Sequence, residues 1–425
     1  MEWAVGFAPG GVAYDSGKNE VFVSNSVSSN VVVISDATNA VVATIPVAAS
    51  RVGLSISGLA YDSGKGEVFV ANSGLNSVNV ISDATNAVVA NVTVGSSPYE
   101  LAYDRLKGAV FVANYESNNV SVIADATNTV VANIPVGSHP YGVTYDSARG
   151  EVFVANRGSD TITVISDATN TVLVTIPVSA SPFQSMPYGL AFDAGKGEVF
   201  VSNSGGSETV SVISDATDTV VATIHMVASA AELAYDDREG ELFLANGPGN
   251  TVSVISDATN AVVAGIVVGD YASGVAYDSG NGHLYVSNLF QGTVSIISPR
   301  APSITSFAAN PSTVLTGGWT NFTVEASGVA GILTYSYAGL PPGCSSSNTS
   351  KHPCRPTSAG TFNLTVSVAD QDERTAQASA LLIVRLPTSF GLEPTVFFIG
   401  IGLAAALAVV TVLLVIRRKK RRRTQ

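Results

Sequence analysis

The chain has few charged residues and almost no cysteine. Of its 425 residues, 13% are charged, about half the ~25% usual for a globular protein. The 46% hydrophobic content is too high for a disordered chain, and Lys and Glu are too rare for a coiled coil. Two cysteines cannot build a disulfide scaffold or a Cys₄ metal site. The composition therefore favours a folded, weakly charged protein.

Basic residues are scarce outside the C-terminal end. Residues 417–423 contain 7 of the 21 basic residues, so residues 1–416 contain 14 basic and 33 acidic residues, a net charge of −19. A nucleic-acid-binding protein would carry a basic face on its folded part. We therefore expect no nucleic-acid partner.

One apolar run predicts a membrane anchor. Residues 395–416 contain no charge, and a helix of that length, at 1.5 Å per residue, spans a hydrocarbon core of ~30 Å. Basic residues stay on the cytoplasmic side. The run thus predicts a single-pass protein of the cell membrane with residues 1–394 outside and the basic tail, 417–425, in the cytoplasm.

The N-terminus does not match that topology. An exported protein begins with a basic segment followed by an apolar core. The sequence that starts with Met1-Glu2-Trp3 has neither of these two segments. We expect that the chain starts downstream of its true start or that a signal was removed. A tail-anchored protein with a cytoplasmic N-terminal part is the alternative, but it would move the basic tail across the membrane.

Seven copies of one pattern fill the first 298 residues. An aromatic-Asp pair recurs at spacings of 42–47 residues, and an Asn that ends an apolar run follows each aromatic by eleven. A Val/Ile run, the turn SDATN and another apolar run complete each period. Four short β-branched runs in ~42 residues, repeated seven times, predict a seven-bladed β-propeller.

The ends of the repeat array complement each other. The seventh repeat stops after Ile297 without a fourth strand, while residues 1–6 align with a fourth strand that has no blade of its own. Pairing these residues with the seventh blade would close the ring and remove an exposed edge.

The segments VFVAN and LYVSN after YDSGKGE resemble the YVTN family of β-propeller repeats, known from archaeal surface-layer proteins. The resemblance covers residues 1–298. It implies a seven-bladed propeller at the cell surface and no chemistry.

Residues 299–386 have a different pattern. Expected strands lie near 303–308, 320–326, 332–337, 362–369 and 376–384, and AGTFNLTVSVAD (359–370) resembles the last strands of PKD-like and Ig-like modules. We therefore expect an Ig-like β-sandwich, followed by a juxtamembrane linker at 387–394. The overall fold class is all-β with one C-terminal transmembrane helix.

The only two cysteines lie close together in this second region. Cys344 and Cys354 are ten residues apart and, in an exported domain, are expected to form a disulfide. A zinc site with His352 is the competing interpretation, but one loop supplies only three ligands. Sequons that fit an exported glycoprotein lie at Asn91, Asn119, Asn321, Asn348 and Asn363.

Residues present in every repeat are expected to serve the fold. The repeated aromatics, Asp and Asn should pack blades and close turns, because Asn and Asp accept backbone bonds and tolerate left-handed φ. A ring of the seven repeated Asp residues could hold a cation at the channel mouth, but the pattern alone does not justify a metal site. The five Glu that begin the second strand of a repeat are expected to be solvated.

No catalytic site stands out. The chain has no GxSxG, P-loop, dinucleotide or CxxCH motif, and its four histidines occupy four different repeat positions. A lactonase-like hydrolase with a site in the central channel is the alternative function, but it needs a non-repeating acid or base there, and no such group is evident. We expect no catalytic residues, no cofactor and no enzyme activity.

Loop lengths indicate where binding is expected. The first turn of each repeat never changes length, whereas five-residue insertions precede the second and fifth inner strands, at 48–58 and 179–189. Both lie on the face that also carries variable loops, where binding sites are commonly built. We expect an envelope protein or glycan to bind here, through Arg51, Leu54, Tyr115, Glu116, Arg157, Phe183, Gln184, Met186, Tyr188, Leu289 and Phe290.

Overall fold

The structure is a computed structural model that describes residues 2–47, 56–178, 184–206, 208–226, 229–297, 303–327, 333–369 and 375–387. The chain separates into two compact units, Met1–Ile297 and Ser298–Gln425. No helix in the described ranges is long and apolar enough to span a membrane. The predicted span at 395–416, the basic tail and linker residues 388–394 lie outside these ranges.

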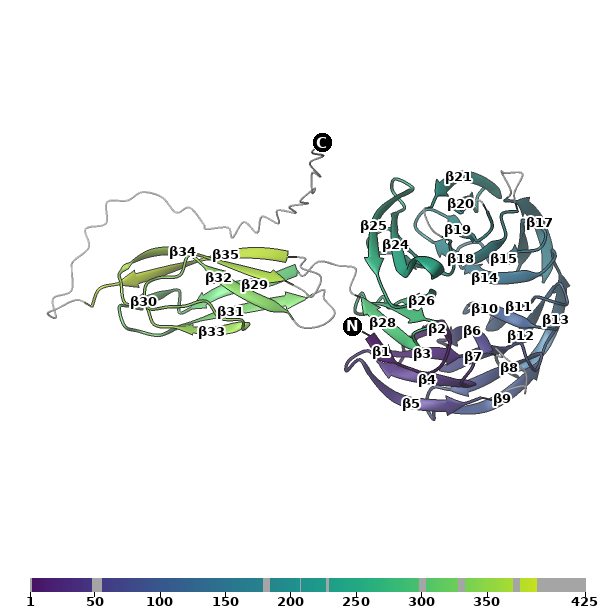
Figure 1. Cartoon of the computed structure of the whole chain (residues 1–425), viewed down its shortest axis with the longest axis horizontal. Helices are drawn as coiled ribbons and strands as arrows, with labels where there is room; N and C mark the ends of the chain where they lie inside the picture. Colours follow the sequence, from purple (N-terminus) through teal and green to yellow (C-terminus); the bar gives the residue numbers. More distant parts are fainter. Residues whose placement is uncertain are drawn as a thin grey trace, which may run out of the picture. The chain divides into compact units, whose positions relative to one another are not determined.

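The first unit is a ring of seven four-stranded antiparallel sheets, with one strand of each sheet facing the centre (Figure 1). The innermost strands are β2 (Pro9–Asp15), β6 (Ile56–Asp62), β10 (Pro98–Asp104), β14 (Pro140–Asp146), β18 (Pro187–Asp193), β22 (Leu233–Asp236) and β26 (Ala272–Tyr277). The second strands are β3 (Glu20–Asn25), β7 (Glu67–Asn72), β11 (Ala109–Asn114), β15 (Glu151–Asn156), β19 (Glu198–Asn203), β23 (Glu241–Asn246) and β27 (Leu284–Asn288).

The two outer strands of each sheet complete the blade. The third strands are β4 (Asn30–Ser35), β8 (Ser77–Ser82), β12 (Asn119–Ala124), β16 (Thr161–Ser166), β20 (Thr209–Ser214), β24 (Thr251–Ser256) and β28 (Thr293–Ile297). The outermost strands are β5 (Ala40–Pro46), β9 (Ala87–Thr93), β13 (Thr129–Pro135), β17 (Thr171–Pro177), β21 (Thr219–His225), β25 (Ala261–Val267) and β1 (Glu2–Ala4). A 3₁₀ turn, η1 (Gly247–Gly249), follows β23.

The apolar runs form these strands because both faces of each sheet are covered. Phe22, for example, is fully buried in a cluster that combines residues of the first blade with Ile56 and Val68 of the second. Similar clusters join each following pair of blades up to the seventh. The repeated aromatic side chains of the second strands therefore pack neighbouring blades together.

The N-terminal strand supplies the missing fourth strand of the last blade. Residues Glu2, Trp3 and Ala4 of β1 pair antiparallel with Ser295, Val294 and Thr293 of β28, and β1 lies beside β28 in Figure 1. The buried Val5 continues this contact, since its N–H donates to the Gly292 carbonyl at 3.0 Å. The ring thus closes with the pairing expected from the sequence.

The SDATN segments form the tight turns expected of them. Their last residue adopts a left-handed conformation in all six copies, with φ between 49° and 54°. Asparagine and aspartate tolerate this conformation better than other non-glycine residues. These residues are Asn39, Asn86, Asn128, Asn170, Asp218 and Asn260.

The second unit is a sandwich of two sheets. One sheet contains β29 (Ser303–Asn310), β31 (Thr320–Ser327) and β33 (Lys351–Cys354), and the other contains β30 (Thr313–Leu315), β35 (Thr375–Arg385), β34 (Gly360–Ala369) and β32 (Thr334–Ala338), in these spatial orders. A single hydrophobic cluster joins both sheets, with Phe322 from one and Leu364 from the other fully buried. The five expected strands are present, but the short β30 and β33 were missed because neither contains an apolar run.

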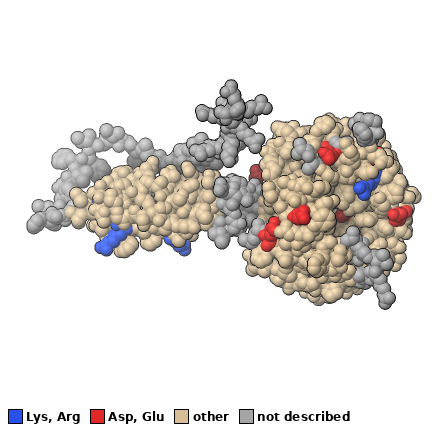
Figure 2. Space-filling view, in the orientation of Figure 1, with Lys and Arg blue, Asp and Glu red and all other residues tan. Residues whose placement is uncertain are grey.

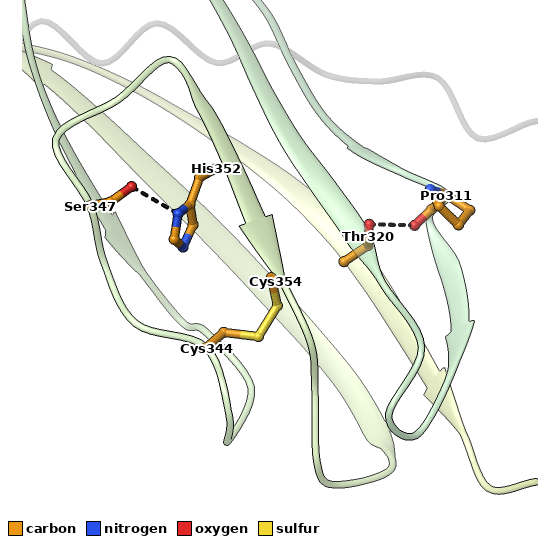
Figure 3. Close-up of a disulfide and its surroundings, with 6 residues drawn as sticks. All are labelled: Pro311, Thr320, Cys344, Ser347, His352 and Cys354. Atoms are coloured by element: carbon orange, nitrogen blue, oxygen red, sulfur yellow. Dashed lines mark hydrogen bonds between the residues drawn. A yellow bond between two sulfur atoms is a disulfide. The ribbon is translucent and has the colours of Figure 1, made fainter.

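The two cysteines form the expected disulfide. Cys344 and Cys354 are joined with their Cα atoms 5.2 Å apart (Figure 3). The buried His352 is engaged elsewhere, because its Nδ1 lies 2.8 Å from the Ser347 hydroxyl and its ring packs against Tyr337. The sulfur atoms are thus bonded to each other, which excludes the alternative zinc site.

Candidate functional site

A bulge interrupts the inner strands at the end that joins the variable loops. In β10, Pro98 pairs with Asn114 and the next pair is Leu101 with Val112, so Tyr99 and Glu100 lie between the two pairs. The same shift occurs in β2, β6, β14, β18 and β26. Bulges redirect side chains and are common beside binding sites.

The bulge residues surround a cavity of about 140 Å³. All seven blades contribute to its wall, so the cavity lies on the axis of the ring. The residues at the first bulge position are Gly10, Ser57, Tyr99, Tyr141, Tyr188 and Ser273, and those at the second are Gly11, Gly58, Glu100, Gly142, Gly189 and Gly274; the equivalent residues of the sixth blade, Ala231 and Glu232, directly precede β22. Three consecutive blades thus carry tyrosine where the others have small residues, and two blades carry glutamate where five have glycine.

The three tyrosines form a continuous row. The ring centroids of Tyr99 and Tyr141 are 4.8 Å apart and those of Tyr141 and Tyr188 are 4.0 Å apart, with interplanar angles of 28° in both pairs. The hydroxyls of Tyr141 and Tyr188 are 2.5 Å apart and share a hydrogen bond. Burial raises the pKa of all three hydroxyls, so they remain neutral donors.

Side chains from the variable loops extend this row. Tyr115 meets Tyr99 edge to face, with centroids 5.4 Å apart, and also packs against His139 at 4.6 Å. The guanidinium of Arg157 lies 5.8 Å from the centre of the Tyr188 ring, within cation–π range. Inner strands and loops of blades three to five therefore build one aromatic surface. We call it the tyrosine row; it consists of Tyr99, Tyr141 and Tyr188, extended by Tyr115 and Arg157.

The two glutamates fit against glycines of the preceding blade. A Cβ atom on Gly58 would lie 2.3 Å from Oε2 of Glu100, and one on Gly189 would lie 2.8 Å from Oε2 of Glu232. Cβ atoms do not approach other heavy atoms this closely. Glycine at these two positions therefore makes room for the carboxylates.

The environment of the two carboxylates favours their protonated forms. Burial raises the pKa of Glu232 to about 7, and burial together with the charge of Glu232 raises that of Glu100 well above its usual range. Neither forms an ion pair with a described residue, and Oε1 of Glu232 is buried without a hydrogen-bond partner among those residues. The cavity thus contains two interacting acids that the surrounding structure does not neutralise.

Several residues predicted from the sequence lie at this site. Tyr115, Arg157 and Tyr188 belong to the tyrosine row, and the exposed Glu116 follows Tyr115. Arg51, Leu54 and Phe183 lie outside the described residues, as do residues 48–55 and 179–183 of the two insertions.

Other predicted residues do not join the row. Phe290 is 68% exposed and packs on Tyr271 with centroids 4.7 Å apart, while the Leu289 N–H donates to the Tyr271 carbonyl. Gln184 is exposed, and the Met186 N–H donates to the Asp160 carboxylate at 2.8 Å. Met186 therefore has a structural role in its loop.

The sequence interpretation missed Glu100, Glu232, Tyr99 and Tyr141. The sequence interpretation found no non-repeating acid in the channel, and this was wrong because Glu100 and Glu232 line the cavity. The error arose because only the residues common to the repeats were compared. The signal was available: PYE and AAE interrupt a position that is glycine in the other five blades.

The opposite end of the inner strands is uniform. The repeated Asp residues are buried and cap the first turn of their blade, as Asp62 does by accepting from the N–H groups of Gly64 and Lys65. Lysines of these turns reach the next blade, as Lys65 does toward the Asp125 carbonyl at 2.5 Å. The structural interpretation of these Asp residues is thus confirmed, and no cluster of three metal-ligating side chains occurs in the described ranges.

The Glu residues that begin the second strands were expected to be solvated, and this expectation was wrong. They are partly or fully buried instead of solvated, and Glu151 is only 7% exposed. The Arg149 guanidinium lies 3.2 Å from its carboxylate. These groups therefore belong to the packed end of the blades.

The predicted glycosylation sites differ in accessibility. Asn91, Asn321, Asn348 and Asn363 are exposed. Asn119 is half-buried, and its amide oxygen accepts from Asn114 Nδ2 and the Ser117 hydroxyl. Asn119 is therefore the least suitable acceptor of the five.

This geometry defines a β-propeller with a tandem β-sandwich. Similar solved structures include hydrazine synthase of Kuenenia stuttgartiensis (TM-score 0.60, 16% identity, covering 68% of this chain and 95% of that one). A streptogramin B lyase has a TM-score of 0.60 and 12% identity, covering 70% of this chain and 96% of that one. A chain of a mitotic checkpoint complex has a TM-score of 0.60 and 11% identity, covering 70% of this chain and 90% of that one. No family model and no curated protein sequence matches the chain. At these identities the likeness shows the fold alone.

Proposed function

We propose that this protein is a cell-surface binding protein that holds its ligand at the tyrosine row, at the mouth of the central cavity. The observation that carries the proposal is the row itself. Three consecutive blades place stacked tyrosines where the remaining blades have glycine, serine or alanine. Tyrosine offers a large apolar surface and a polar hydroxyl, a combination enriched at binding sites.

The row belongs to the face that the loop lengths single out. Tyr115 and Arg157 come from variable loops, whereas the Asp-capped turns of the other face repeat from blade to blade. A rigid ring that presents variable side chains at one end is a common arrangement for recognition. The partner we favour is an envelope protein or glycan.

Binding of the full-length chain to an array of immobilised glycans and peptides tests this proposal. Tyr99→Ala and Tyr188→Ala should each weaken capture by about tenfold or more, because central aromatic contacts dominate many interfaces. Leu106→Ala is the matched control, since Leu106 is 67% exposed in a turn of the uniform face. Equal binding by all variants, or a loss caused by Leu106→Ala alone, would contradict the proposal.

The location is part of the proposal. The uncharged run at 395–416 and the basic tail support a membrane anchor with the propeller outside. The resemblance to YVTN repeats and to PKD/Ig-like modules also favours the cell surface. External protease on intact cells should digest the propeller and leave a tail epitope protected, and the reverse pattern would refute this topology.

A lactonase-like hydrolase is the second candidate. The observation in its favour is the pair Glu100 and Glu232, because burial brings the pKa of Glu232 to about 7, the range of an effective general base. Hydrolysis of dihydrocoumarin that Glu232→Gln abolishes would establish this function, and absence of turnover across pH 6–9 would favour binding alone.

A further inference from the structure

We propose that the ligand group held at the tyrosine row is an organic ammonium cation, bound by the carboxylates of Glu100 and Glu232 beside the row. This inference rests on the proposed binding function and specifies its chemistry. The glutamates come from blades three and six and face the same central cavity as Tyr99, Tyr141 and Tyr188. Carboxylates bordered by aromatic side chains are surroundings that recognise ammonium groups.

The unneutralised acids are the first argument. Neither carboxylate has an ion-pair partner among the described residues, and the buried Oε1 of Glu232 has no hydrogen-bond partner there. Partly buried acids of this kind cost free energy unless a cation or proton joins them. In five blades the same position is glycine, so the repeat does not need an acid there.

The tyrosine row already holds one cation. Arg157 lies over the Tyr188 ring and forms no ion pair with a described acid. Because Tyr141 stacks on the Tyr188 ring and Arg157 also lies over it, a ligand cation would contact the edges of the row and the two carboxylates. The loops that carry Tyr115 and Arg157 also contain Glu116, which is exposed, and Asp160, whose carboxylate accepts from the Met186 N–H.

The charge of the propeller supports the same ligand. Residues 1–297 contain 9 basic and 28 acidic residues, a net charge of −19, whereas residues 298–416 contain five of each. Figure 2 shows how few side chains on the visible face are charged. A strongly negative ring raises the local concentration of cations and speeds their association.

A metal ion fits the cavity less well. Hard divalent cations prefer six or more oxygen ligands, and no group of three metal-ligating acidic, His or Cys side chains occurs among the described residues. Neutral tyrosines whose hydroxyl pKa values are raised would be poor substitutes. The cavity, with two carboxylates bordered by tyrosine side chains, favours an organic cation.

Calorimetry on the full-length chain with choline and its neutral isostere 3,3-dimethylbutan-1-ol tests the inference. At pH 8 choline should bind about tenfold or more tightly than the isostere, because only choline carries the charge. Its affinity should fall as the pH is lowered below 7, because protonation neutralises the carboxylates. Glu100→Gln and Glu232→Gln should each weaken choline about tenfold and leave the isostere unchanged.

Glu198→Gln is the matched control, because Glu198 is a partly buried glutamate of the opposite face, and it should bind choline as the parent does. Equal affinity for the two probes, or unchanged choline binding by both cavity variants, would overturn the inference. The pH dependence of the parent protein tests it even if a variant fails to fold. Array binding that depends on Tyr99 and Tyr188 without choline binding would reject the ammonium ligand and leave the proposed function standing.

Discussion

Tyrosine serves two different purposes at the two ends of the same inner strands. At the uniform end, Tyr103 donates to the Asp125 carboxylate at 3.1 Å and Tyr145 makes the equivalent bond in the next blade. At the variable end, Tyr99, Tyr141 and Tyr188 stack on one another in only three blades. The repeated tyrosines are bound into the framework, whereas the singular ones border a cavity with unneutralised acids.

The difference teaches how to interpret a repeat protein. The pKa values of Tyr61, Tyr103 and Tyr145 are raised by burial and by hydrogen bonding to the inner-strand Asp of the preceding blade, so each repeated group links two blades. A residue that every blade needs for this purpose reports on the ring. Residues that depart from the repeat are not needed by every blade, so they are the better candidates for function.

The largest expected effect comes from opening the ring. Deleting residues 1–6 removes β1, exposes the edge of β28 and deprives Asn25 Nδ2 of the Val5 carbonyl, 3.1 Å away. We expect the free energy of unfolding to fall by about 3–5 kcal/mol, measured by urea denaturation. Glu2→Ala, which removes an exposed side chain and its exposed hydrogen bond from Gln291, should change it by less than about 0.5 kcal/mol. A deletion as stable as the parent would show that closure does not stabilise the ring.

The next effect separates the two ends directly. Asp62→Ala should lower the free energy of unfolding by about 2–4 kcal/mol, because the N–H groups of Gly64 and Lys65 lose their acceptor in a buried turn. Ligand binding at the tyrosine row should not change, which array binding can check. A variant of normal stability that loses binding would reverse the roles assigned to the two ends.

The acids of the variable end should make stability depend on pH. The folded-state pKa of Glu232 is raised to about 7 from an ordinary 4.5, so the folded state binds the proton more tightly than the unfolded state. The resulting stabilisation is fully present below pH 4.5 and is lost as the pH rises through 7.

Glu232→Gln should therefore gain stability relative to the parent protein between pH 4.5 and 7, as measured by thermal unfolding at a series of pH values. The exposed Glu2→Gln is the control and should follow the parent at every pH. A difference between Glu232→Gln and the parent that does not change with pH would mean that the carboxyl titrates normally in the folded state.

Most of the fold could be predicted because the same sequence pattern is repeated in every blade. Seven copies of the aromatic-Asp and Asn pattern define the blade, and the incomplete last copy defines how β1 pairs with Thr293–Ser295. The short strand β33 could not be found, because KHPC has no strand-like apolar pattern and is held by the disulfide and by pairing with β31.

The site was harder to predict, because its residues are distant in sequence. Glu100 and Glu232 are far apart along the chain and approach each other only when the ring closes. Their identity as exceptions is visible in the aligned repeats, but their burial and their effect on each other's charge are not. Tyr115 and Arg157 were found from the variable loops, whereas the stacked partners Tyr99 and Tyr141 belong to strands and were overlooked.

The smallest expected effect tests whether the variable face acts as a whole or through the tyrosine row alone. Phe290 was predicted to bind, yet it is 68% exposed and contacts Tyr271 of the seventh blade rather than the row. Phe290→Ala should change the free energy of unfolding by less than about 0.5 kcal/mol. It should weaken array binding less than twofold, against about tenfold for Tyr188→Ala, because contacts outside the centre of an interface contribute little. If both substitutions weaken binding equally, the ligand spans the mouth of the ring from blade five to blade seven, and the site is the whole face.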